Sequence, residues 1–132
     1  MNQPTLDRLL TEAHIEQTVT QYLELDGWRS IKTDPVSRKE WGKGFGELGM
    51  ADRLYIRYDA RIVHDHETSD VKQPGAQVIW IEFKRKGLRP LPEQKAWIDA
   101  EMKRGAVVLV VDDIDGFEQW YRRSGLMRRA IR

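Results

Sequence analysis

The sequence predicts an α/β fold in which helices flank a mixed sheet. Three observations predict it. Apolar residues recur at helical spacing before Asp26, residues 78–81 are apolar on both faces as in a strand covered on both sides, and a helical segment beginning at Pro92 separates that strand from the apolar run 106–111. Strand, helix and strand in this order form a right-handed crossover. The expected order is αβββαβ plus a C-terminal helix, in one domain spanning 1–132.

In the first half of the chain, the first helix should run from near Leu6 or Thr11 to Asp26, where Gly27 stops it. Residues 28–33 are typical of a short strand, and a glycine-containing loop follows. Alternating apolar residues predict a second strand over 52–58, which residues 61–63 extend or return across a turn. The polar segment 64–75 is expected to be an exposed connection.

In the second half, the strand that includes residues 78–84 should place Trp80, Glu82 and Lys84 on one face, with Ile81 and Phe83 on the other. The next helix should run from Pro92 to Gly105, because proline suits a helix start and glycine a helix end. Residues 106–111 predict a buried strand, and residues 115–123 a closing helix.

Composition narrows the class of protein. The 132 residues include no cysteine, which excludes disulfides and cysteine-ligated metal sites and fits a reducing, cytoplasmic compartment. No apolar run reaches the roughly 18–20 residues that span a bilayer, and the polar start does not resemble a signal peptide. We therefore expect a soluble protein without a membrane partner.

The net charge of +1, from 22 basic and 21 acidic residues, conceals three basic groups. Such groups could contact the phosphates of a nucleic acid, although solvated helix faces and charged termini look the same in a sequence. The groups are Arg38, Lys39 and Lys43; Lys84, Arg85, Lys86 and Arg89; and Arg122, Arg123, Arg128, Arg129 and Arg132.

The charged end of the third strand carries the strongest chemical signal. Glu82 and Lys84 share a face there, and Asp52 follows a glycine-containing loop. A surface ion pair is the plainer interpretation of Glu82 and Lys84, but charges at the end of a buried strand suggest a cleft. Carboxylates are ligands for Mg²⁺ or Mn²⁺, which can activate water and stabilise charge on a phosphoryl group. The pattern indicates metal-dependent phosphodiester cleavage.

The order of these motifs resembles a known family. Glu16 on the first helix precedes Gly27, a glycine-to-aspartate segment ends at Asp52, Glu-x-Lys spans residues 82–84, and Gln94 begins a helix. Over nearly its whole length the chain resembles a VRR-NUC domain of the PD-(D/E)xK nuclease superfamily, of the stand-alone type found in phages and bacteria. The family usually has proline before the aspartate, whereas this chain has Ala51. Its turn must therefore be set by other contacts.

The resemblance implies a restriction-endonuclease-like core and a structure-selective DNA endonuclease that is Holliday-junction-resolvase-like or flap-cutting. It implies a homodimer in the cytoplasm of a bacterial or phage-infected cell, with Mg²⁺ or Mn²⁺ as cofactor and branched or junction DNA as partner. Glu12, one turn before Glu16, is an alternative helix acid. The implied catalytic residues are Glu16, Asp52, Glu82, Lys84 and Gln94. The implied metal ligands are Asp52, Glu82 and the Phe83 backbone carbonyl, with Glu16 as a further candidate.

The expected DNA contacts come from two basic groups and one tryptophan. Trp41 could stack on an unpaired base or pack over the sheet edge. Residues near the end of the chain could form a dimer interface or complete the protomer's own core. The DNA-binding candidates are Arg38, Lys39, Trp41, Lys43, Arg85, Lys86 and Arg89, and the interface candidates are Trp120, Tyr121, Leu126 and Met127.

Two other functions fit parts of the pattern. A catalytically silent nucleic-acid-binding or assembly module could keep the fold and the basic groups, but it would not need Asp52, Glu82 and Lys84 together. A restriction-type enzyme would need a base-reading element for which the chain has little room. His64 and His66 could suggest another metal site, although alternate histidines in a polar connection are more often exposed.

Overall fold

A four-stranded mixed sheet forms the centre of the protein. The computed structural model describes residues 11–33, 46–59, 61–63 and 71–128. The sheet order is β1-β2-β5-β6, with antiparallel pairing of β1 with β2 and of β2 with β5, and parallel pairing of β5 with β6. The predicted mixed sheet is confirmed. Its strands are β1 (Arg29–Lys32), β2 (Arg53–Tyr58), β5 (Ala76–Phe83) and β6 (Val107–Val111).

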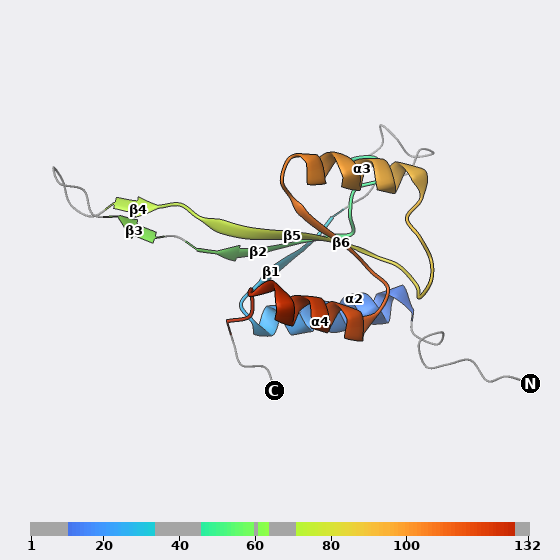
Figure 1. Ribbon diagram of the computed structural model, residues 1–132, viewed down its shortest axis with the longest axis horizontal. Helices are drawn as coiled ribbons and strands as arrows, with labels where there is room; N and C mark the ends of the chain where they lie inside the picture. Colours follow the sequence, from blue (N-terminus) through green and yellow to red (C-terminus); the bar gives the residue numbers. More distant parts are fainter. Residues whose placement is uncertain (1–10, 34–45, 60, 64–70, 129–132) are drawn as a thin grey trace, which may run out of the picture.

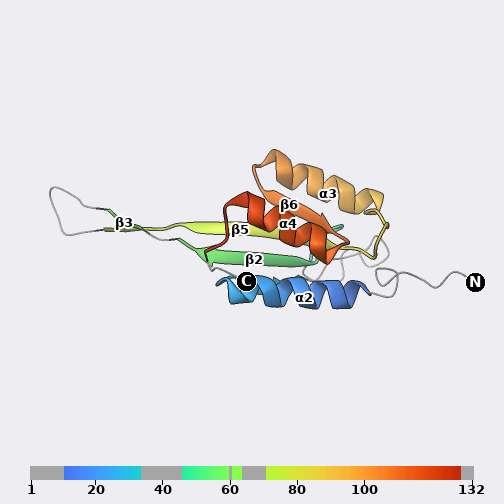
Figure 2. The same cartoon turned by 60° about the horizontal axis from the view of Figure 1, so that its bottom comes forward.

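Helices cover both faces of this sheet, as Figures 1 and 2 show. Helices α2 (Glu12–Leu25) and α4 (Ile114–Ser124) lie on one face, and α3 (Pro92–Lys103) lies on the other. The first described helix begins at Glu12 because Thr11 caps it, accepting a hydrogen bond from the His14 N–H at 3.1 Å. None of the described helices is long and apolar enough to cross a membrane.

The two faces of β5 pack against different layers, as strand alternation predicts. Ile79, Ile81 and Phe83 are buried against α2 and α4 in the larger core cluster. Trp80 faces α3, where its ring meets that of Trp97 edge-on at 5.0 Å between centroids. The strand is therefore covered on both sides, and its polar end is held in place by two apolar layers.

A second, two-stranded sheet extends away from the layered core in Figure 1. It pairs β3 (Arg61–Val63) with β4 (Val71–Gln73) in antiparallel register. The expectation that 64–75 is only a connection is wrong for residues 71–73. The pairing uses backbone groups, so the polar composition of this segment does not reveal it.

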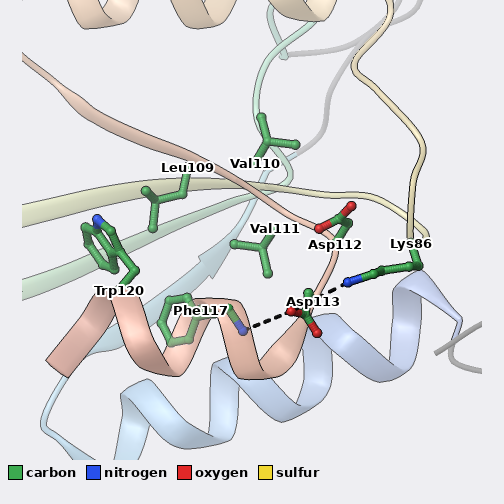
Figure 3. Close-up of a pocket in the computed structure, with 9 residues that line it drawn as sticks. Lys86, Leu109, Val110, Val111, Asp112, Asp113, Phe117 and Trp120 are labelled. Atoms are coloured by element: carbon green, nitrogen blue, oxygen red, sulfur yellow. Dashed lines mark hydrogen bonds and ion pairs between the residues drawn. The ribbon is translucent and has the colours of Figure 1, made fainter. Parts of the chain in front are cut away.

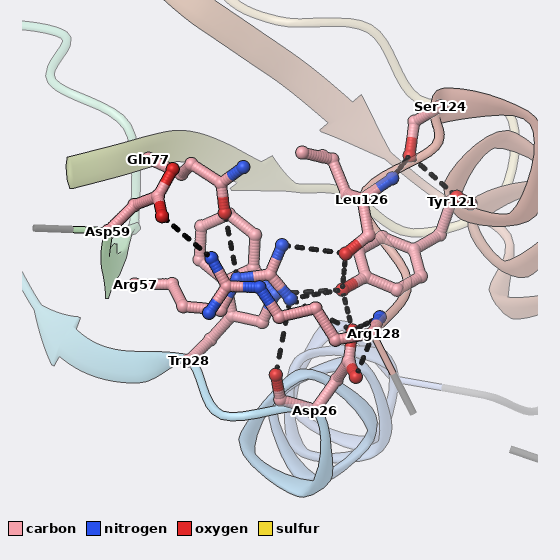
Figure 4. A network of polar contacts seen from close by, with 9 residues as sticks. All are labelled: Asp26, Trp28, Arg57, Asp59, Gln77, Tyr121, Ser124, Leu126 and Arg128. Carbon is pink, nitrogen blue, oxygen red and sulfur yellow. Dashed lines mark hydrogen bonds and ion pairs between the residues drawn. The ribbon is translucent and has the colours of Figure 1, made fainter. Parts of the chain in front are cut away.

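A buried ion pair ties the end of α2 to β2 and α4 (Figure 4). The Arg57 Nη1 atom lies 3.1 Å from Asp26 Oδ2, and both side chains are almost fully buried. Tyr121 donates its hydroxyl hydrogen bond to the same carboxylate and accepts one from Trp28 Nε1 at 2.8 Å. The Arg57 guanidinium also lies over the Trp28 ring and donates to the Leu126 carbonyl at 2.6 Å. Partners of this guanidinium thus come from the segment 26–28 before β1, from α4 and from the segment that follows α4.

Removing one member of this network should therefore lower the free energy of unfolding. In Asp26→Ala the Arg57 charge stays buried without its carboxylate, and we expect the free energy of unfolding to fall by about 3–5 kcal/mol in chemical denaturation. Asp59→Ala is the matched control, because Asp59 pairs with Arg128 at 3.7 Å where both side chains are nearly half exposed. That change should cost less than about 1 kcal/mol. Equal losses in the two variants would contradict the role assigned to the buried pair.

Candidate active site

The pairing of β2 with β5 brings two carboxylates together. Arg53 lies opposite Ile81 in this antiparallel register, so one further step places Asp52 opposite Glu82. Residues opposite each other in antiparallel strands share a face of the sheet. The Phe83 N–H donates a 2.7 Å hydrogen bond to Asp52 Oδ2, which fixes the Asp52 side chain beside the end of β5.

Glu82 is almost completely removed from solvent, with 2% of its surface exposed. Its Oε1 accepts a hydrogen bond from Gln94 Nε2 at 3.1 Å and lies 4.0 Å from Lys84 Nζ. Its Oε2 is buried without a hydrogen-bond partner in the described part of the chain. Four of the predicted site residues, Asp52, Glu82, Lys84 and Gln94, therefore meet at one point.

The pKa of Glu82 is raised to about 8, chiefly by burial and then by the neighbouring Asp52 through its charge and a hydrogen bond that favours the protonated form. Lys84 acts in the opposite direction but does not cancel these effects. Two crowded carboxylates and a partnerless buried oxygen form an environment that a cation would stabilise. Their hard oxygen donors suit Mg²⁺ or Mn²⁺.

The carboxylates available for a metal are few. Within the described ranges, no three His, Cys, Asp or Glu residues are grouped as a metal site. The ligand set implied by the family resemblance needs only two carboxylates, with the Phe83 carbonyl as a backbone ligand. Magnesium commonly keeps several of its waters and takes one or two carboxylates, so the residues present fit such an ion.

Gln94 is held in a single orientation at the start of α3. Its Oε1 accepts the Leu91 N–H at 2.8 Å, which leaves its amide nitrogen to donate to Glu82. The N-terminal end of a helix carries partial positive charge. The start of α3 therefore places both a hydrogen-bond donor and a favourable dipole beside the buried carboxylate.

The loop before Asp52 is fitted closely to α3. Gly49 has a positive φ of 73°, and a Cβ added there would lie 2.2 Å from the Glu93 backbone oxygen. Trp97 Nε1 also donates to Glu47 Oε2 at 2.7 Å. The same helix that presents Gln94 thus fixes the loop that presents Asp52, and the two residues keep a constant separation.

Thr33 sets the turn in which this chain has Ala51. Its hydroxyl donates to the backbone oxygens of Ala51 and Asp52, and its N–H donates to the Asp52 oxygen at 3.0 Å. Ala51 itself is fully buried in the layer beneath α3. The sequence interpretation missed Thr33. The sequence held no signal for it, because the register that places Thr33 opposite Asp52, one step beyond the pairing of Lys32 with Arg53, is visible only in the structure.

The two candidate helix acids have different surroundings. Glu16 lies 3.2 Å from Arg53 Nε and 3.8 Å from Lys32 Nζ, so it forms a local ion-pair group. Glu12 Oε1 accepts the Arg85 N–H at 3.2 Å, and its charge contributes to the raised pKa of Glu82. The surroundings of Glu12 connect it to the Glu82 site, whereas the role of Glu16 stays a prediction.

The remaining predicted residues fall into three groups. Arg85, Lys86 and Arg89 are exposed on the loop 84–91 that follows β5. Tyr121 is fully buried, and the other interface candidates Trp120, Leu126 and Met127 are partly buried against the same core. Tyr121 is therefore a core residue and cannot contribute an exposed interface contact. Outside the described residues lie Arg38, Lys39, Trp41, Lys43, His64 and His66.

Comparisons of this chain with protein-family models, curated proteins and solved structures found no match.

The charge repulsion at Glu82 should lower the stability of the metal-free protein. A folded-state pKa raised from 4.5 to about 8 means that folding is favoured by the proton at low pH, and that this stabilisation is lost as the pH rises from about 5 to 8. Glu82→Gln removes the titrating group while keeping the oxygen that accepts from Gln94. We expect it to raise the free energy of unfolding at pH 8 by about 2 kcal/mol in chelator-treated protein, with little change at pH 4.5. A loss of stability in this variant at pH 8 would contradict the assigned environment.

A second prediction concerns the contact between the glycine loop and α3. Gly49→Ala adds a methyl group that collides with the Glu93 backbone, and it should lower the free energy of unfolding by more than about 2 kcal/mol. Gly87→Ala is a matched control, since Gly87 has φ 83° but no atom within 4 Å of an added Cβ. Only the backbone strain of about 1–2 kcal/mol applies there. Thermal and chemical unfolding should separate the two variants, and equal destabilisation would show that the contact has no effect.

Proposed function

We propose that the protein is a metal-dependent DNA endonuclease that hydrolyses phosphodiester bonds. The observation that carries this proposal is the pairing of Asp52 with Glu82, whose buried Oε2 has no hydrogen-bond partner in the described structure. A pair of this kind is stabilised either by the proton that the raised pKa of Glu82 retains or by a bound cation, and the buried oxygen is suited to the cation. Lys84 and Gln94, which both approach the other Glu82 oxygen, complete a set of side chains suited to phosphoryl chemistry.

Each residue has a defined part in this proposal. Asp52, Glu82 and the Phe83 carbonyl would hold Mg²⁺ or Mn²⁺, with Glu16 as a further candidate. A bound ion supplies an activated water and Lewis-acid polarisation of the phosphate. Lys84, with 13% of its side chain exposed, can reach the solvent side of the site and stabilise charge that develops on phosphate oxygens. Gln94 holds the Glu82 carboxylate in place through its hydrogen bond to Oε1.

The finer assignments rest on the resemblance to VRR-NUC domains. On that basis we propose a restriction-endonuclease-like core, a homodimer, and selectivity for branched DNA such as four-way junctions or flaps. The exposed cations Arg85, Lys86 and Arg89 on the loop after β5 lie where they could contact the phosphates that flank the cut. The bacterial or phage-infected cytoplasm is the proposed location.

The proposal is tested by a substrate panel with Mg²⁺ or Mn²⁺: four-way junction, flap, nicked, duplex and single-stranded DNA. Asp52→Asn keeps an oxygen for the Phe83 N–H but loses the negative charge. We expect it to cleave more than about 100-fold more slowly while binding DNA as before in Ca²⁺. Asp99→Asn is the control, since Asp99 is exposed on α3 and, among the described residues, forms an ion pair only with Lys95. Full activity of Asp52→Asn would remove the site assignment.

The same panel distinguishes the alternatives. Binding of branched DNA without cleavage under any metal would support the silent binding module. Glu12→Gln and Glu16→Gln, compared at saturating metal, identify the helix acid that assists cleavage. The glutamate whose replacement causes the larger loss of turnover is the one that assists cleavage.

A further inference from the structure

A cavity lies between the edge strand β6 and helix α4, separate from the face that carries Gln94. Its volume is about 290 Å³. The apolar wall includes Leu109, Val111, Phe117 and Trp120, and the opposite end includes Lys86, Asp112 and Asp113 (Figure 3). Apart from Lys86, a proposed phosphate contact, none of these residues has a part in the proposed nuclease function. The cavity combines an apolar, partly aromatic wall with a charged rim.

At the aromatic end of the cavity, the Trp120 ring is held in place by its neighbours. Trp120 is partly buried and leans on Phe117, with 6.1 Å between ring centroids and a 40° angle between the planes. Because Phe117 is itself fixed in the core, the indole is supported from behind. Supported aromatic rings of this kind form stacking surfaces for unpaired bases.

The charged end supplies mainly hydrogen-bond acceptors. Asp112 Oδ2 accepts the Gly87 N–H at 3.0 Å, and Asp113 Oδ2 accepts the Gly116 N–H at 3.1 Å and lies 3.6 Å from Lys86 Nζ. These bonds fix both carboxylates at the rim and leave each with further lone pairs that can accept hydrogen bonds. Carboxylates accept hydrogen bonds from amino groups on base edges and repel carbonyl oxygens.

The cavity is close to the proposed cleavage site along the sheet. Glu82 lies opposite Val110 and Phe83 opposite Val111 in the parallel register, and the Lys84 N–H donates to the Val111 oxygen at 3.0 Å. The loop that starts at Lys84 then contacts Asp112 through Gly87. The rim of the cavity therefore lies at the same end of the sheet as Lys84, within one loop of the proposed cleavage site.

We propose that this cavity binds an unpaired nucleobase with an exocyclic amino group, from the nucleotide next to the cleaved phosphodiester. The base stacks on Trp120 and donates its amino hydrogens to Asp112, and Lys86 contacts the adjoining phosphate. Cytosine, adenine and guanine carry such an amino group. Thymine carries none, and the two carbonyl oxygens that flank its N3–H would be repelled by the carboxylate. The inference rests on the proposed nuclease function and adds a preference for the base beside the cut.

The first experiment varies one base at a time on each side of the cut in the best substrate from the panel, using cytosine, adenine, thymine or an abasic site. At one position the wild-type protein should cleave the cytosine or adenine substrate about tenfold faster than the thymine or abasic substrate. Asp112→Asn should bring this ratio close to one, whereas Asp99→Asn should keep it. A flat ratio at every position, with cleavage that still depends on Asp52, would overturn the base site and leave the nuclease proposal intact.

The second experiment does not depend on cleavage. An oligonucleotide with 2-aminopurine at the selected position, or at each position of a single strand in turn, is bound in Ca²⁺ by the Asp52→Asn protein. Stacking on Trp120 should quench its fluorescence, and adding Trp120→Leu should remove the quenching. Circular dichroism shows whether that double variant is folded, and Asp52→Asn with Asp112→Asn provides the test if it is not. Unchanged fluorescence in the bound complex of the Asp52→Asn protein would contradict stacking.

A second copy of the chain could instead insert a side chain into the cavity. Light scattering distinguishes this occupant from a base. If Trp120→Leu converts a dimer into a folded monomer and the wild-type base ratio is flat, the cavity is a protein interface and the base proposal is wrong. If Trp120→Leu leaves the oligomeric state unchanged but removes the preference for the base beside the cut, the base proposal is supported.

Discussion

The antiparallel register between β2 and β5 determines the chemistry available to this protein. It places Arg53 opposite Ile81, and the next step outward sets Asp52 against Glu82 at the point where the apolar part of the sheet ends. A shift of one residue would move Glu82 to the face covered by α2 and α4 and separate the carboxylates. The apolar residues that fix the register therefore also fix the site.

The site and the stabilising contacts are separated in space. At the site, burial and the neighbouring Asp52 disfavour the charged form of Glu82. At the other end of the sheet, Arg57 contacts Asp26 and Trp28 in the connection between α2 and β1 and the Leu126 carbonyl after α4, as Figure 4 shows. The two packed layers and this network offset the unfavourable charges. The arrangement is typical of a functional site supported by a rigid scaffold.

The sequence predicted the parts of the fold that side-chain periodicity reports. The alternation around Ile81 located both faces of β5, and Pro92 located the start of the helix that carries Gln94. It did not predict β4, because that strand is held by backbone pairing, nor the role of Thr33, whose bonds reach backbone oxygens of a distant segment. Contacts between distant backbone groups leave no periodic pattern in the side chains.

The close approach of Gly49 to α3 restricts the residue at position 49 but not the residue at position 93. On the helix side the contact uses only main-chain atoms of Glu93, which any residue at that position would supply. On the loop side, glycine alone leaves room for them. In related chains the side chain at position 93 could therefore vary freely while glycine at position 49 is kept. A conserved glycine would then indicate a close backbone neighbour even where the neighbouring residue itself is not conserved.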